Sequence, residues 1–299
     1  MSENLNTQSA LLTGAKQTMA AWSKVIESYE AVPAIYRSFF ETQFADKQQF
    51  PYTVLAPSLV KPRGKTNEKM IYDANDAIHI LERIGTQVTI KSYPYQTVCT
   101  VEVGSILLSS WLTINGLTST GETSTSTIDY NTASARYFSP FLNKLRPAPQ
   151  SVDESEFTAE KDKFDYLSAI SFKLMNFGRS SLVYGEIVRH SLLQSEIREP
   201  IWTILGSMFQ RTISPAHLTI LTNQELILIH DVERGKEVPG PRYGGVWQYI
   251  PLCSITSATL SKPINDRITL SITLSSNETI EKLFEASRKS ELEQLYAQL

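Results

Sequence analysis

The chain has 299 residues, of which 41% are apolar and 20% charged, so it can bury a core and is not of the disordered class. A net charge of −3, from 28 Lys and Arg against 31 Asp and Glu, gives no overall footprint for nucleic acid. Two cysteines are too few for a disulfide scaffold and favour a reducing compartment. With no leader segment and no long apolar run, we expect a cytoplasmic protein of two folded units.

The chain begins with apolar residues spaced alternately three and four apart. This stripe predicts a helix over residues 8–31, since Pro33 disfavours helix at the residue before it. Its members are Leu12, Ala15, Met19, Trp22, Ile26 and Tyr29. A shorter helical pattern follows from Ile35 to Phe44, so residues 1–48 are expected to form N-terminal helices. The first apolar face either docks on its own chain or pairs with another, and Met19, Trp22 and Ile26 are its candidate interface residues.

A first β unit is expected over residues 49–146. Short β-like runs broken by Gly, Pro, Asn and Asp occur at 52–55, 77–81, 87–91 and 106–114. The Ser/Thr-rich stretch 119–127 predicts an exposed hairpin loop. Phe138, Phe141 and Leu145 then return to helical spacing, in a terminal helix that Pro140 interrupts.

A second β unit is expected over residues 164–299. It follows a polar, mostly acidic segment, 147–163, that begins with Pro147 and Pro149 and is predicted to be a linker. A helical stripe from Phe164 to Phe177 precedes β-like runs, and the chain closes with a helical pattern. The runs are 187–193, 217–221, 226–230, 246–252 and 268–274.

The similar order of elements predicts an internal repeat. The shift along the chain that carries Cys99 onto Cys253, here called the cysteine offset, pairs many apolar positions with one another. It places both cysteines at one buried strand position in separate units, where they would be reduced and poorly accessible. Other pairs are Tyr95 with Tyr249, Tyr130 with Phe284, Phe138 with Leu292, Phe141 with Leu295 and Leu145 with Leu299.

The second unit resembles the bacterial pleckstrin-homology-like (PH-like) and GRAM families. The residues that carry the resemblance are Leu221-Thr-Asn-Gln-Glu-Leu-Ile-Leu-Ile229, Tyr249-Ile-Pro-Leu252 and Ile255. It covers residues 187–299; the first unit matches only through the repeat, with Thr97 in place of Pro251. The resemblance implies an α+β, mainly β chain of two PH-like barrel or sandwich units, each closed by a C-terminal helix, after an N-terminal helical segment. Most families with this fold bind ligands or proteins, but fold alone does not license function.

Enzyme signatures are mostly missing. Gly64-Lys65-Thr66 lacks the earlier glycine of a phosphate-binding loop, because Leu59 occupies that position. Gly116 to Gly121 lacks the spacing of a nucleophile elbow. The four histidines, His79, His190, His217 and His230, have no metal-ligand spacing. We therefore expect no catalytic residues, no metal and no cofactor.

The strongest local candidate site is the basic loop 61–69, between the first two strands of the first unit. Lys61, Arg63, Lys65 and Lys69 surround one acid, Glu68. In lipid-binding pleckstrin-homology domains this loop holds phosphate through clustered Lys and Arg, so the resemblance implies an anion or lipid-headgroup site. The alternative is an ordinary solvated loop.

The corresponding loop of the second unit, residues 200–209, is apolar instead. It is expected to be a helix packed on its unit or an exposed contact for a partner or membrane, with Trp202 and Phe209 as candidate interface residues. We therefore expect a non-catalytic binding or scaffolding protein that recognises a protein partner or self-assembles. The alternative is a peripheral protein that reads anionic headgroups on a membrane through the basic loop; no nucleic-acid partner is expected.

Overall fold

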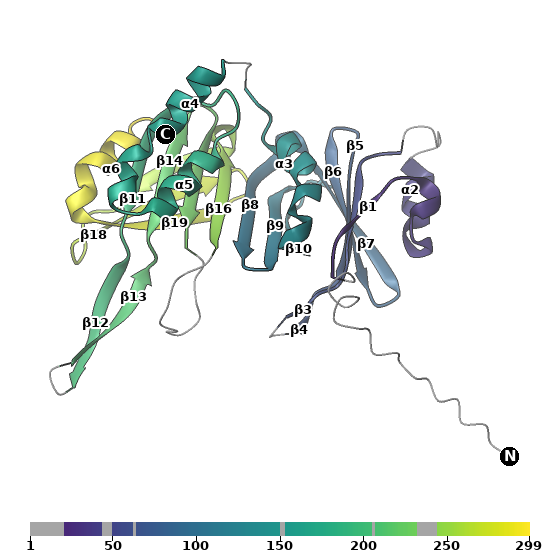
Figure 1. Ribbon diagram of the computed structural model, residues 1–299, viewed down its shortest axis with the longest axis horizontal. Coiled ribbons are helices and arrows are strands. Elements are labelled where there is room, and N and C mark those ends of the chain that lie inside the picture. The colour runs from purple at the N-terminus through teal and green to yellow at the C-terminus, as the bar shows by residue number, and fades with distance from the viewer. Residues whose placement is uncertain (1–20, 44–49, 62–63, 150–152, 205–206, 232–243) are drawn as a thin grey trace.

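The fold is α+β and mainly β, as the sequence predicts. The computed structural model describes residues 21–43, 50–61, 64–149, 153–204, 207–231 and 244–299, but not the side chains of residues 42–43 and 200–210. Within these ranges the strands form several antiparallel sheets, none of which closes into a barrel (Figure 1).

The first half contains a five-stranded sheet in the order β1-β2-β5-β6-β7. The hairpin β3–β4 is inserted between β2 and β5. After β7 the chain turns a corner at the 3-10 helix η3 (Tyr95–Thr97) and forms three more strands, β8, β9 and β10. The bounds are β1 (Lys24–Ile26), β2 (Thr53–Ala56), β3 (Val60–Lys61), β4 (Gly64–Lys65), β5 (Glu68–Ala74), β6 (Ala77–Ile84), β7 (Gln87–Pro94), β8 (Val98–Ile106), β9 (Ser109–Leu117) and β10 (Thr123–Asn131).

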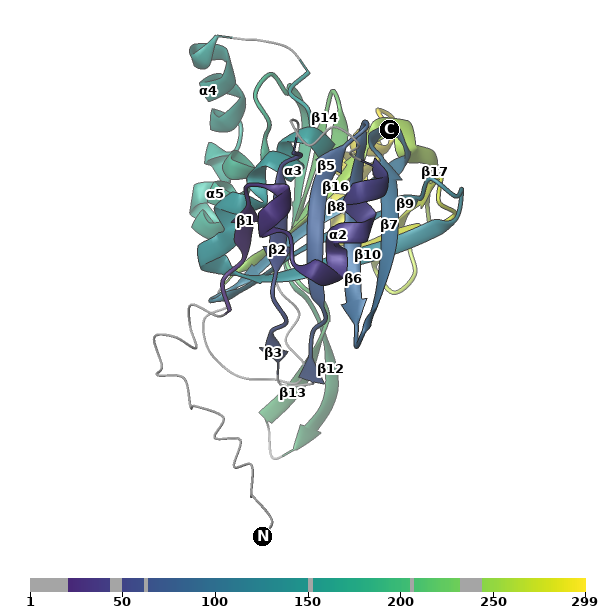
Figure 2. The ribbon, with the colours of Figure 1, turned by 90° about the vertical axis from the view of Figure 1, so that its right-hand side faces the viewer.

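The second half has the same order of strands. Four strands, β11, β14, β15 and β16, lead to a corner at the 3-10 helix η6 (Leu252–Ser254) and then to β17, β18 and β19. The hairpin β12–β13 is inserted after the first of them and projects on the same side as β3–β4 (Figures 1 and 2). The bounds are β11 (Val188–Gln194), β12 (Ile197–Ile204), β13 (Ser207–Ser214), β14 (His217–Thr222), β15 (Glu225–His230), β16 (Gly245–Pro251), β17 (Ile255–Leu260), β18 (Arg267–Leu274) and β19 (Thr279–Glu285).

One seven-stranded sheet joins the two halves. Its order is β10-β9-β8-β16-β15-β14-β11, and β8 pairs with β16 from Val101–Tyr249 to Ser105–Gly245. The two strands approach closely at Gly244, where a Cβ would lie 1.8 Å from the Ser105 carbonyl oxygen and φ is +90°. Only glycine suits that position. Apolar residues of both halves therefore pack in one shared core.

Helices cover the sheets. α2 packs on the five-stranded sheet, where the ring centroids of Phe40 and Tyr72 are 4.8 Å apart. α3 lies in the shared core, where the ring centroids of Phe141 and Tyr52 are 5.2 Å apart. α6 places Leu292 and Leu295 in a second core, against β17–β19. The bounds are η1 (Tyr29–Ala31), η2 (Ala34–Tyr36), α2 (Arg37–Gln43), η4 (Thr132–Tyr137), α3 (Ser139–Leu145), α4 (Glu154–Asp162), η5 (Asp165–Ala169), α5 (Phe172–Ser181), η7 (Ala286–Arg288) and α6 (Lys289–Tyr296).

The predicted helix over residues 8–31 is wrong in its described part. β1 runs through Lys24–Ile26 and pairs with β2, and Tyr29 begins a 3-10 turn. The β-branched residues Val25 and Ile26 suit a sheet edge, where the main chain gains ladder hydrogen bonds that outweigh a helical spacing of side chains. Residues 8–20 lie outside the described residues. The shorter helical pattern from Ile35 is confirmed by η2 and α2.

The segment 147–163 is not a plain linker, because it contains α4. Asp153 caps this helix by accepting a hydrogen bond from the Ser155 N–H. The ring centroids of Phe157 and Tyr184 are 4.9 Å apart. The Glu160 carboxylate accepts a hydrogen bond from the Val188 N–H at 2.6 Å. One aromatic ring and one carboxylate are enough to anchor a segment that is otherwise polar.

Three local predictions in the first half are also corrected. The Ser/Thr-rich stretch is mostly strand β10, where hydroxyls pair across strands, as Thr113 and Thr127 do at 2.9 Å. The run 106–114 breaks at Leu107 into two strands. Pro140 does not interrupt α3, because it lies in the first turn, where its missing N–H breaks no helical bond.

The cysteine offset does not align the two corners. Pro94 and Pro251, with φ of −56° and −54°, each precede the 3-10 turn at a corner, and the offset does not pair them. It does pair Asn131 with Glu285, which are the caps of η4 and η7. Cys99 and Cys253 are consequently not equivalent: Cys99 is buried on β8, and Cys253 is exposed in η6.

The described parts of the loop 200–209, residues 200–204 and 207–209, are strand and not the predicted helix. Their backbone belongs to β12 and β13, in which Trp202 is the register partner of Phe209. The β-branched residues Ile201, Thr203 and Ile204, with the aromatic Trp202, favour a strand here.

Candidate functional site

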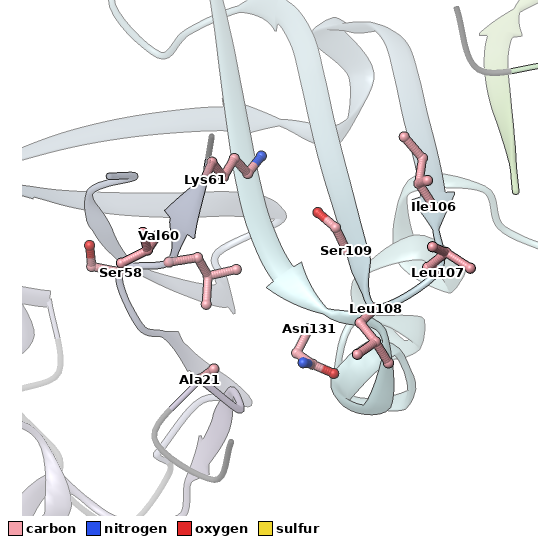
Figure 3. A pocket seen from close by; sticks show the side chains of 10 residues that line it. Ala21, Ser58, Val60, Lys61, Ile106, Leu107, Leu108, Ser109 and Asn131 are labelled. Atoms are coloured by element: carbon pink, nitrogen blue, oxygen red, sulfur yellow. The ribbon is translucent and has the colours of Figure 1, made fainter. Parts of the chain in front are cut away.

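A groove of about 800 Å³ lies between the hairpin β3–β4 and the turn that joins β8 to β9. Figure 3 shows Val60 and Lys61 on one wall and Leu107, Leu108 and Asn131 on the other. Three apolar side chains here are strongly exposed: Val60 at 86%, Leu107 at 67% and Leu108 at 72%. Neighbouring exposed apolar side chains of this kind mark interaction sites.

The turn between β8 and β9 conflicts with ordinary turn chemistry. Leu107 has φ of +52°, a left-handed conformation that Cβ disfavours by about 1 kcal/mol and that Gly, Asn and Asp adopt more readily. The other non-glycine residues with positive φ in the described ranges are all Asn or Asp. Leu107 therefore combines a strained backbone with an exposed apolar side chain, a combination that burial does not explain.

Specific contacts hold both walls of the groove in place. The Lys61 ammonium forms an ion pair with Asp129 of β10, and the Leu59 N–H donates to Thr66 Oγ1 at 2.9 Å, which closes the hairpin β3–β4. On the other wall, the Thr132 N–H donates to the Leu108 carbonyl at 3.0 Å, and the Asn131 side chain accepts from the Ala133 N–H at 2.9 Å. The groove is thus formed before any partner arrives.

The structure separates the basic residues predicted from the loop 61–69. Lys61 is paired with Asp129. Lys69 lies 3.4 Å from Glu82 and donates to the Thr127 carbonyl. Lys65 is exposed on β4, and Arg63 lies outside the described residues. Two of the four side chains are already neutralised by carboxylates, so the described part of the loop is not a cluster of uncompensated cations.

Trp22 and Ile26, the described members of the predicted interface on the N-terminal stripe, do not share a face. Trp22 is 41% exposed, whereas Ile26 is buried under α2 with Tyr36 and Phe40. Met19 lies outside the described residues, as do the side chains of Trp202 and Phe209. Of this set, the structure leaves only Trp22 as a described surface residue.

Two of the four histidines, His79 and His217, are buried, whereas His190 and His230 are half-buried. His79 shares hydrogen bonds with Ser92 Oγ (2.7 Å) and the Ala74 carbonyl (3.1 Å), and burial lowers its pKa. Burial also lowers the pKa of His217 to about 4. Over the described ranges no three His, Cys, Asp or Glu side chains are grouped to hold a metal ion. None of the described helices is both long and apolar enough to cross a membrane.

A buried charge cluster joins the two halves. Arg146, which follows α3, donates from Nε to both carboxylate oxygens of Glu225 at 2.9 and 3.1 Å, and its guanidinium lies 3.5 Å from the centroid of the Tyr249 ring. Glu186 lies 3.6 Å from the same guanidinium and accepts from Thr222 Oγ1 at 3.0 Å. Burial and the charge of Glu225 raise the pKa of Glu186 to about 7. Because all three charged side chains are buried, the cluster offers no surface to a substrate and instead binds the halves together.

Sequence reasoning missed the pair Leu107 and Leu108 because it placed them inside one continuous strand. The signal that could have identified them is the lack of a polar turn residue at the point where β8 ends and β9 begins. Comparison with known proteins adds nothing to this site, since no family model and no curated protein matches the chain.

Proposed function

We propose that the chain is a non-catalytic binding protein built from two PH-like units, 49–146 and 164–299. Each unit supplies four strands, a corner, three strands and a terminal helix. Each corner starts with a proline of the same backbone conformation, Pro94 or Pro251. The residues that resemble the PH-like and GRAM families form β14, β15 and the corner of the second unit. These three observations support the proposal.

The binding surface is the groove beside the β8–β9 turn. The observation that carries this assignment is Leu107, which holds an apolar side chain in solvent at a backbone position that favours Asn or Gly. Neither the local backbone nor the core gains from leucine there. A partner that buries Leu107 and Leu108 would gain roughly 1.5 kcal/mol or more from each.

The partner that fits this groove best is a protein segment with apolar side chains. The walls present Val60, Leu107 and Leu108, and Lys61, the cation among the described lining residues, is engaged by Asp129. A phosphorylated headgroup would have to compete with that carboxylate and with Glu82 at Lys69. The geometry therefore favours an apolar peptide over the anionic ligand that the loop sequence predicts.

Site-specific photo-crosslinking tests this function. A photoreactive side chain at Leu108 should capture one partner in the native host, and the same group at Ile170, a 58% exposed residue at the end of η5, should not. Leu107→Asn in the Leu108 probe should abolish the capture. Equal capture from both positions, or capture that survives Leu107→Asn, contradicts a specific site at the groove.

Vesicles test the alternative headgroup ligand. Vesicles containing phosphatidylserine or a phosphoinositide should not bind the chain more tightly than neutral vesicles, because Lys61 and Lys69 are paired. Binding that falls on Lys65→Glu and with added salt would favour the headgroup over the apolar peptide.

A further inference from the structure

The pairing of β8 with β16 shows what fits the edge of a three-strand segment in this protein. β8 is the first of the three strands after the corner in the first half, and its outer edge is covered by β16, the fourth strand of the second half. Val101, Val103 and Ser105 of β8 face Tyr249, Trp247 and Gly245 of β16. The two halves are thus joined by antiparallel pairing of β16, the last strand before the corner of the second half, with β8, the first strand after the corner of the first half.

The strand that corresponds to β8 in the second half is β17, which lies at the end of the sheet β17-β18-β19. No described strand pairs with the outer side of β17. The Ser261 N–H donates to Thr269 inside the sheet. Because main-chain groups alternate along an antiparallel strand, those of Ala258 and Leu260 point outward. The Ala258 carbonyl already accepts from Tyr296 Oη at 3.3 Å, so the free edge centres on Leu260.

The strand that corresponds to β16 in the first half is β7, and it is also an edge. β7 ends the sheet β1-β2-β5-β6-β7. The Ser92 carbonyl points outward and accepts from the Ser119 N–H at 2.9 Å, so the groups of Ile90 and Val88 point outward as well. The free part of this edge centres on Ile90, which is an exposed side chain.

We propose that β17 of one copy pairs with β7 of a second copy, which repeats between chains the contact that β8 and β16 make within one. The shift that carries Pro94 onto Pro251 transfers the in-chain register to these two strands. It places Leu260 opposite Ile90, as Val103 faces Trp247, and Lys262 opposite Val88. This inference rests on the two-unit architecture proposed above.

The assembly is head-to-tail, since the two edges are different surfaces. Each added copy leaves one free β7 and one free β17, so the contact produces an open chain unless its rotation closes a ring. The pairing is short, because the carbonyls of Ala258 and Ser92 are already occupied. β7 also lacks a counterpart of Gly244, where β16 meets β8 closely. We expect a weak association that grows with concentration.

Proline at an outward-facing position tests the pairing, because it removes the edge N–H and leaves the internal ladder intact. The variants are Ile90→Pro in β7 and Leu260→Pro in β17. Lys262→Pro is a second variant on the β17 edge that spares the packing of Leu260 on the second core. Sedimentation velocity of the full chain should give a mass that rises with concentration for the wild type and a monomer for each variant.

An equimolar mixture of Ile90→Pro and Lys262→Pro chains decides the orientation. Each variant keeps one working edge, so the mixture should form dimers and nothing larger, whereas each variant alone stays monomeric. A wild type that is monomeric at about 1 mM, where millimolar affinities would be visible, overturns the proposal. So does a single variant that still associates, or a mixture that does not.

The proposed binding at the groove and the proposed pairing of β7 with β17 can be disproved independently of each other. Leu107→Asn should leave the concentration-dependent mass unchanged, because Leu107 lies in the β8–β9 turn and belongs to neither β7 nor β17. Loss of self-association with intact capture at Leu108 would remove only the pairing of copies. Intact self-association without capture at Leu108 would remove only the groove.

Discussion

The two halves of the molecule place different residues in the turn that joins the first two strands after the corner. Between β17 and β18 the positive φ angles fall on Asn265 and Asp266, residues that adopt this conformation at little cost. Between β8 and β9 the positive φ falls on Leu107, which is followed by a second exposed leucine, Leu108. One turn obeys local backbone chemistry and the other violates it. The comparison teaches that sequence choice at the β8–β9 turn is set by something other than the fold.

The halves also differ in how their last helices are secured. α6 rests on apolar side chains within its own half, where Leu292 and Leu295 join the second core. α3 has apolar anchors too, but its end is fastened to the other half through the charges of Arg146, Glu225 and Glu186. The terminal helix of the first half is therefore secured across the join between the halves, whereas that of the second half is secured within its own half.

The largest effect that we expect is a difference in reactivity between the two cysteines, Cys253 and Cys99. Cys253 is exposed in η6, whereas Cys99 is buried on β8 among residues of the second core. A thiol reagent under native conditions should label Cys253 on the order of a thousand times faster than Cys99. The Cys99 thiol can react only after the surrounding structure opens by local or global unfolding. Mass spectrometry of Cys253→Ser and Cys99→Ser chains measures each rate. Similar rates would restore the equivalence that the cysteine offset predicts.

The next largest effect is the loss of the buried cation. Arg146→Ala leaves Glu225 and Glu186 buried without their partner and should lower the free energy of unfolding by about 3 to 5 kcal/mol. Denaturant unfolding measures the change. Arg136 is the matched control, since its guanidinium also lies over a tyrosine ring, that of Tyr137, but on the surface. Arg136→Ala should change stability by less than about 0.5 kcal/mol, and an equal loss in both variants would contradict the role of the cluster.

A pH-dependent effect of intermediate size belongs to Glu186. Its pKa is raised to about 7 in the folded chain, chiefly by burial, above its ordinary value of 4.5. The folded state therefore holds the proton more tightly, and this contribution to stability is complete below pH 4.5 and is lost as pH rises toward 7. It amounts to at most about 3 kcal/mol.

Glu186→Gln isolates that contribution. The stability of the wild type relative to Glu186→Gln should fall as pH rises from 5 to 7, and the difference between them cancels other titrations. His217, whose pKa is lowered to about 4, has the opposite sign, because its contribution is lost as pH falls below 6.5. A constant difference between wild type and Glu186→Gln would show that Glu186 is ionised throughout.

The smallest effect is the reverse exchange at the ordinary turn. Asn265→Leu places in the second half the strain that Leu107 carries in the first, and should cost about 1 kcal/mol in thermal or denaturant unfolding. No change in stability would mean that leucine is tolerated at positive φ in these turns and would remove the argument from strain.

The sequence predicts much of the fold because β periodicity is local. The runs near residues 77–81 and 226–230 lie within β6 and β15, and the spacing of Phe138, Phe141 and Leu145 predicts α3. Errors arose where neighbours distant in the chain decide the outcome. β1 is a strand because β2, which follows only after η1, η2 and α2, offers it a partner, as in the pair Val25 and Val54. No helical stripe records that pairing.

The candidate site was harder to predict because it depends on contacts between distant segments. The positive charges of the loop 61–69 are visible in the sequence, but the carboxylate that neutralises Lys61 is Asp129, which is remote in the chain. Leu107 and Leu108 resemble core residues in a sequence, since only the backbone angle and the exposure distinguish them. The join at Arg146 was likewise invisible, because both of its partners lie in the other half.

The free energy of unfolding of Leu107→Asn tests the central claim most directly. If Leu107 is kept for binding, the exchange relieves a strained backbone and sacrifices little burial, so the variant should be more stable than the wild type by roughly 0.5 to 1 kcal/mol. A variant that is less stable by about 1 kcal/mol or more would show that Leu107 serves the fold, and the groove would then lose its claim to be the binding site.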